Sequence, residues 1–229
     1  MQFDWHRLFD MYSWSYYSLP LLLLLTIYVA MKAATVKPPT NITRAITVYA
    51  AASALQNIFI STEFLYTPLY QNQYAASFSI VLFIIVELGC CYYLVNASII
   101  SHLQKKTTQL LLLLFGIYTS VYTYVYFFSG FYEDGISLVQ LPIMLLYCCM
   151  YYYNLIKRPP KQALIKQPLF WAIGGMCFVA MLLLPYSLIS NYLGEHISTR
   201  PLLHLIPTFC YAILSFTHLK ALQCSQQKP

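Results

Sequence analysis

Charged residues are scarce in this chain. Asp, Glu, Lys and Arg together make up 9% of its 229 residues, whereas a soluble domain carries about 25%. No polar block of domain size interrupts the apolar runs, so neither a fused kinase domain nor another soluble effector domain is expected. A chain that is 59% hydrophobic cannot bury so much apolar surface in water. We therefore predict an integral membrane protein.

Several motifs of enzymes and binding proteins are also missing. The sequence has no CxxC, no HExxH, no phosphate loop and no mid-span lysine for a retinal Schiff base. The pairs Cys90-Cys91 and Cys148-Cys149 carry soft ligands of the kind Cu(I) or Zn prefers. Adjacent helical residues point about 100° apart, so we interpret these cysteines as small packing residues. We expect no catalytic residue, no metal, no cofactor and no nucleic-acid partner.

Seven apolar segments account for most of the chain. Each is long enough to cross a hydrocarbon core about 30 Å thick as a helix. They run from about 16–34, 44–66, 74–100, 108–129, 135–156, 168–191 and 201–222. The sequence therefore predicts an all-α fold, a bundle of seven transmembrane helices that forms one domain over residues 1–229.

The basic residues are unequally divided between the expected loops. Arg7 and Arg200 fall on one side, and the remaining 11 of the 13 basic residues fall on the other. Those 11 are Lys32, Lys37, Arg44, Lys105, Lys106, Lys157, Arg158, Lys161, Lys166, Lys220 and Lys228. Because cytoplasmic loops carry an excess of Lys and Arg, we predict that the N-terminus is outside and the C-terminus is cytoplasmic.

One carboxylate interrupts an apolar segment. Glu87 lies at the centre of the third expected span, where a charge is costly and usually faces a protein interior or a watery cavity. The other acidic residues fall in expected loops, tails or helix ends on the outer side. Glu87 is therefore the first candidate for a functional residue.

Other polar residues in the spans are candidates for the same site. They are Gln56 and Asn57 near the middle of the second span, Gln140 and His204 in the outer parts of the fifth and seventh, and Tyr118 and Tyr122 on one face of the fourth. One interpretation is that they line an outward-facing cavity for a ligand. The other is that they hold the bundle together through interhelical hydrogen bonds of about 0.6–2 kcal/mol each, and for the two tyrosines we favour packing. His218 is expected near a helix end and is given no role.

Two short patterns carry a resemblance. The third span has Glu87 in an apolar run followed by Tyr92-Tyr93, and the sixth opens with Pro168-Leu169-Phe170-Trp171 and then Gly174. In these respects the chain resembles a loose family of small bacterial seven-span proteins that look like sensory or accessory modules. The family often has a carboxylate where this chain has Gln140, and asparagines near His204, so the resemblance transfers only Glu87 as a site residue. It implies a place in the bacterial inner (cytoplasmic) membrane.

Three functions remain open from the sequence. The leading one is a receptor-like or accessory subunit that binds a small or lipidic ligand in the bundle and signals to a cytoplasmic protein through Lys157, Arg158, Lys161 and Lys166. The second is a transporter or oligomeric pore with Glu87 on the permeation or proton path. The third is an intramembrane enzyme acting on lipid, which we favour least because no base is placed beside the single mid-span acid. Membrane lipid is an expected partner in all three, and a homo-oligomer is compatible with each.

Overall fold

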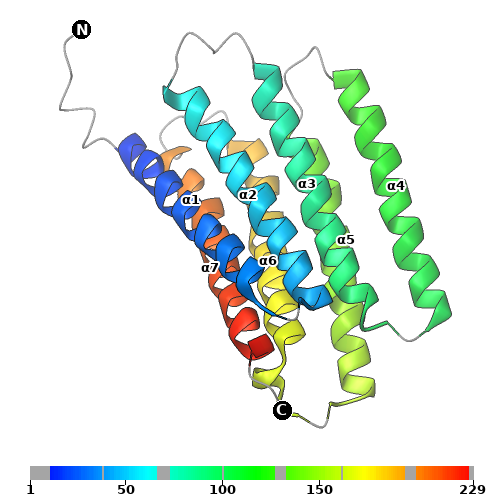
Figure 1. The fold of residues 1–229 in the computed structure, drawn as a ribbon. Helices are drawn as coiled ribbons and strands as arrows, with labels where there is room; N and C mark the ends of the chain where they lie inside the picture. The colour runs from blue at the N-terminus through cyan, green and yellow to red at the C-terminus, as the bar shows by residue number, and fades with distance from the viewer. Residues whose placement is uncertain are drawn as a thin grey trace, which may run out of the picture.

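In the part of the chain that a computed structural model describes, there are seven α-helices and no β-strand. That part comprises residues 11–37, 39–65, 73–99, 101–126, 133–160, 162–193 and 200–226, without the side chains of 11–17, 19, 59–65, 73–78, 126, 133–134, 190–193 and 200–204. The helices are α1 (Met11–Thr35), α2 (Asn41–Leu65), α3 (Gln73–Asn96), α4 (His102–Tyr126), α5 (Glu133–Lys157), α6 (Pro168–Leu193) and α7 (Arg200–Gln226). A short 3₁₀ helix, η3 (Leu164–Lys166), precedes α6 (Figure 1).

Five of the described helices are long and apolar enough to cross a membrane. The segments are Ser79–Asn96, His102–Val125, Gly135–Lys157, Pro168–Ile189 and Leu205–Gln226. Helix α1 contributes a shorter apolar stretch, Pro20–Thr35. A helix satisfies all of its backbone hydrogen bonds internally, which is what lipid requires of a spanning segment. The fold is thus that of an all-α membrane protein.

Six of the helices form a closed ring. Helices α1, α2, α3, α5, α6 and α7 pack in that order, and α7 returns to pack against α1. Contacts of α6 with α2 and α3 fill the middle of the ring. Helix α4 stands outside it, against α3 and α5, and lies at the edge of the bundle in Figure 1. The interior of the molecule is therefore the interior of the six-helix ring.

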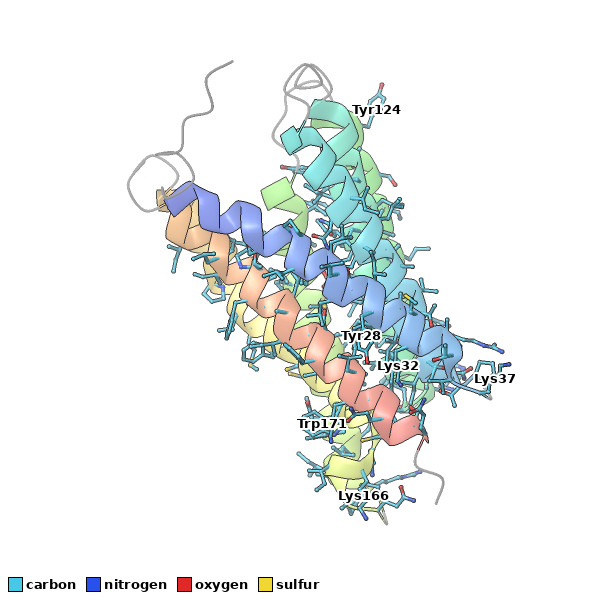
Figure 2. The ribbon with its side chains drawn as sticks, turned by 60° about the vertical axis from the view of Figure 1, so that its left-hand side comes forward. Tyr28, Lys32, Lys37, Tyr124, Lys166 and Trp171 are labelled. Carbon is cyan, nitrogen blue, oxygen red and sulfur yellow. The ribbon has the colours of Figure 1, made fainter. Side chains whose placement is uncertain are left out.

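The described basic side chains gather at one end of the bundle. Successive helices run in opposite directions (Figure 1), so the ends of α1, α5 and α7 lie beside the starts of α2 and α4. Figure 2 shows Lys32, Lys37 and Lys166 toward this end and Tyr124 at the opposite one. We call it the basic end. Its residues are Lys32, Lys37, Arg44, Lys105, Lys106, Lys157, Arg158, Lys166 and Lys220.

A glycine allows a close contact between two helices of the ring. Gly175 of α6 faces α7, and a Cβ atom at this position would overlap the Thr217 hydroxyl and lie 2.8 Å from Cδ1 of Leu214. Small residues let helix backbones approach closely in membranes, where packing drives helix association. The α6–α7 pair thus depends on the absence of a side chain at Gly175.

Candidate functional site

Glu87 lies inside the ring. It is 1% exposed, and its Oε2 accepts a 2.7 Å hydrogen bond from Nε2 of Gln140 on α5. The same nitrogen lies 3.5 Å from the Ile84 carbonyl oxygen. The other carboxylate oxygen, Oε1, is buried and has no hydrogen-bond partner. Two of the residues predicted from the sequence, Glu87 and Gln140, are therefore hydrogen-bonded to each other, and Oε1 of Glu87 remains without a donor.

Two phenols and a thiol surround the carboxylate. Tyr49 of α2 and Tyr211 of α7 both interact electrostatically with Glu87, as does Cys90 one turn further along α3. Tyr49 approaches the carboxylate within hydrogen-bonding range, while Oε1 has no hydrogen-bond partner. Glu87 is the only carboxylate among the described side chains, and no described lysine or arginine side chain forms an ion pair with it. The site holds an acid without a countercharge.

Aromatic rings from three helices lie beside Glu87. Phe83, one helical turn before Glu87, has its ring centroid 5.7 Å from that of Tyr49 and 5.9 Å from that of Tyr211. The Tyr49 ring also meets the ring of His218 edge-on, with centroids 5.0 Å apart. Because Tyr49, Phe83 and Tyr211 come from α2, α3 and α7, the packing of these helices brings the rings together.

His218 is a buried residue that the sequence interpretation missed. It is 1% exposed, and neither Nδ1 nor Nε2 has a hydrogen-bond partner, although buried polar groups are nearly always bonded. The seventh span was expected to end at about 222, whereas α7 continues to Gln226, which leaves two turns beyond His218. The spacing of Tyr211, Ser215 and His218 at i, i+4 and i+7 puts them on one helix face. This spacing could have predicted a buried position for His218.

Gln56 and Asn57 lie away from this site. Asn57 is buried and its Nδ2 donates a 2.8 Å hydrogen bond to the Ser53 carbonyl in its own helix. Gln56 is half-buried. These residues follow Tyr49 by seven and eight positions, which is about 10–12 Å along the helix axis. They are polar groups of the other half of α2.

The two tyrosines of α4 contact the start of α5. Tyr118 Oη donates a 3.1 Å hydrogen bond to the Gly135 carbonyl. Tyr122 lies against Gly135, where an added Cβ would be 2.6 Å from its Cζ. The two rings are 5.6 Å apart and tilted. These contacts attach α4 to the six-helix ring.

His204 lies in the first turns of α7, and its side chain is outside the described residues.

The cysteines are free thiols. Cys91, Cys148 and Cys177 come from α3, α5 and α6 and interact in the interior. The Cys148 thiol also lies 3.9 Å from the Ile173 carbonyl. Within the described residues, no group of three His, Cys, Asp or Glu side chains has the arrangement of a metal site. These thiols fill space between three helices.

A shallow hollow marks the basic end. It has a volume of about 340 Å³ and is lined by Leu155, Ile156, Pro159, Pro160, Gln162, Ala163 and Leu164. The nearby η3 segment is fixed at Ile165, whose carbonyl accepts a 2.8 Å hydrogen bond from the Trp171 indole and a 3.6 Å contact from the Cys224 thiol. Exposed Lys157, Arg158 and Lys166 lie beside the hollow in the sequence.

No protein-family model, curated protein or solved structure matches this chain. The site is therefore interpreted from its own chemistry. It offers an unused carboxylate oxygen, an imidazole with both nitrogens unbonded, and aromatic rings between them. Such a set can accept hydrogen bonds from a guest molecule or hold a proton.

Proposed function

We propose that this protein is a receptor-like or accessory membrane subunit that binds a small or lipidic ligand inside the helix ring at Glu87 and signals to a cytoplasmic partner. The observation that supports this proposal is the buried Oε1 atom without a hydrogen bond. Leaving such an acceptor unsatisfied costs about 1–3 kcal/mol. A ligand that donates to Oε1 removes that cost, and this gain contributes to its binding free energy.

The proposal includes seven spans, an outer N-terminus, a cytoplasmic C-terminus and a bacterial inner membrane. Its support is the collection of described lysines and arginines at one end of an antiparallel bundle. Basic residues accumulate on the cytoplasmic side of membrane proteins. The basic end is then the side from which a signal leaves.

The partner would dock at the basic end. The hollow there is apolar, and Lys157, Arg158 and Lys166 are exposed beside it, while Lys161 lies outside the described residues. An apolar surface flanked by exposed cations is complementary to an acidic amphipathic segment. We assign this segment to a cytoplasmic protein.

Thermal unfolding of the purified protein in lipid nanodiscs tests the ligand site. The wild type and Glu87→Gln are compared against a panel of small polar molecules and extracted lipids. A ligand of the native state raises the midpoint, and we expect that rise to be lost in Glu87→Gln. Thr119→Ala is the control, because Thr119 is buried on α4 and bonds only within its own helix. A panel that never distinguishes wild type from Glu87→Gln contradicts the proposal.

The second candidate is a transporter with Glu87 on a proton path. It is favoured by one observation: a carboxylate, a phenol and an imidazole from α3, α2 and α7 occupy the interior together. Chains of Glu and His inside membranes mark proton relays in transporters. Liposomes containing a pH-sensitive dye separate the two candidates. A proton flux that Glu87→Gln abolishes supports transport, and no flux above that of empty liposomes supports the receptor.

A further inference from the structure

We infer that the ligand of this site is a small primary amine in its ammonium form, held between the Glu87 carboxylate and the rings of Tyr49, Phe83 and Tyr211. This inference rests on the proposed function and names the ligand class. It draws on the charge of the site, on its aromatic rings and on His218.

Charge gives the first argument. The described groups nearest to the carboxylate are Gln140, Tyr49, Tyr211 and Cys90, and none of them is a cation. A buried charge is normally paired, because removing an isolated ion from water is very costly. Gln140 satisfies Oε2 only. An ammonium ion would supply both the missing positive charge and a donor for Oε1.

The aromatic rings give the second argument. Three ring centroids separated by 5.7 Å and 5.9 Å lie next to the acid. A cation within about 6 Å of a ring centroid is attracted by the ring's quadrupole, and desolvated sites strengthen this attraction. Aromatic rings grouped around a carboxylate are the chemistry that recognises organic ammonium ions. A neutral donor can bond Oε1 but lacks the attraction of a cation to the carboxylate and the rings, and an anion is repelled by the carboxylate.

His218 gives the third argument. The His218 ring meets the Tyr49 ring edge-on, with centroids 5.0 Å apart, and both imidazole nitrogens are buried without a hydrogen-bond partner. A neutral imidazole presents one N–H donor and one acceptor nitrogen. An amine that also carries a hydroxyl group can bond Glu87 with its ammonium and His218 with its hydroxyl. We therefore expect an amino alcohol to bind more tightly than a simple alkylamine.

The test uses wild-type protein in phosphatidylcholine nanodiscs, with thermal unfolding measured at matched ionic strength. The probes are ethylammonium and ethanolammonium, with ethanol and acetate as neutral and anionic counterparts. We expect both ammonium ions to raise the midpoint in a concentration-dependent way, ethanolammonium at lower concentration. Ethanol and acetate are expected to leave it unchanged.

Variants assign the contacts. Glu87→Gln should raise the apparent Kd of both ammonium ions at least about tenfold, because a charge-assisted hydrogen bond is lost. His218→Phe should remove the advantage of ethanolammonium over ethylammonium. Thr119→Ala should bind like the wild type. Should Glu87→Gln fail to fold, Tyr211→Phe and Tyr211→Leu form a second pair: the first keeps a ring and the affinity, and the second loses both.

The outcomes separate this inference from the proposed function. Failure of both ammonium ions to stabilise the wild type at millimolar concentrations overturns the inference. Stabilisation by ethanol or acetate that needs Glu87 also overturns it, but leaves an intramembrane ligand site in place. If nothing in the wider panel distinguishes wild type from Glu87→Gln, both proposals fall.

Discussion

Helices α3 and α4 are neighbours in sequence with opposite environments. In the Ser79–Asn96 segment of α3, 56% of the residues are buried, compared with 17% in the His102–Val125 segment of α4. Helix α3 carries Glu87, which bonds to another helix. Buried Thr119 of α4 bonds only to the Phe115 carbonyl of its own helix. One helix builds the interior and the other covers part of its outside.

Mean hydropathy does not predict which of these two helices lies in the interior of the bundle. Both segments are apolar enough to span, with mean hydropathies of 1.9 for α3 and 1.3 for α4. The less apolar of the two is the one with most of its surface exposed. Lipid is as apolar as a protein core, so packing rather than hydrophobicity decides which helix is inside. Mutations that alter packing should therefore separate the two helices.

The largest contrast is expected from one leucine on each helix. Leu88 of α3 is fully buried and Leu113 of α4 is 61% exposed. We expect Leu88→Ala to lower the free energy of unfolding by about 2–5 kcal/mol, because it leaves a cavity, and Leu113→Ala by less than about 0.5 kcal/mol. Reversible denaturation in detergent micelles measures both. Equal losses would show that α4 packs as tightly as α3.

A pair of glycines should give an intermediate contrast. Gly175→Ala places a methyl group against Thr217 and Leu214 of α7, and overpacking of this kind costs about 1–3 kcal/mol. Gly116→Ala on α4 meets nothing within 4 Å and is expected to be tolerated. The same denaturation assay compares them. Destabilisation by Gly116→Ala would show that another surface packs against this face of α4.

The smallest contrast concerns the bond that links α3 to α5. Gln140→Leu removes the 2.7 Å hydrogen bond to Oε2 of Glu87, which we expect to cost about 1–2 kcal/mol. Adding Glu87→Leu removes the orphaned carboxylate, so the double variant should recover much of that stability. Gln56→Leu is the matched control, since Gln56 is only half-buried. Strictly additive losses would mean that the two side chains are not coupled.

The helices themselves could be predicted from sequence, because runs of about 20 apolar residues have few alternatives in lipid. Their ends could not be placed as well. Helix α3 ends at Asn96, before the expected 100, and α4 begins at His102, before the expected 108. Polar residues such as Lys105 and Lys106 continue the helix beyond the apolar run, and hydropathy does not register them.

The composition of the site was harder to predict. A charge in lipid is costly, so an interior position for Glu87 follows from the sequence. Its hydrogen bond to Gln140 does not, because helices that are apolar on all sides give no periodic signal of their order around a bundle. The position of Tyr49 and Phe83 beside Glu87 could not be predicted for the same reason. His218 was overlooked because its depth was judged from an underestimated helix length.

The contact between α7 and α1 that closes the ring has a consequence for biosynthesis. Chains are made from the N-terminus and begin to fold during synthesis, so α7 is the last of the described helices to be made. Until it arrives, Tyr211 and His218 are missing from the interior, and α3 is covered there by α2, α5 and α6 without α7. The surroundings of Glu87 are thus completed only when α7 packs, and a nascent chain that stalls before α7 leaves this buried acid less well covered.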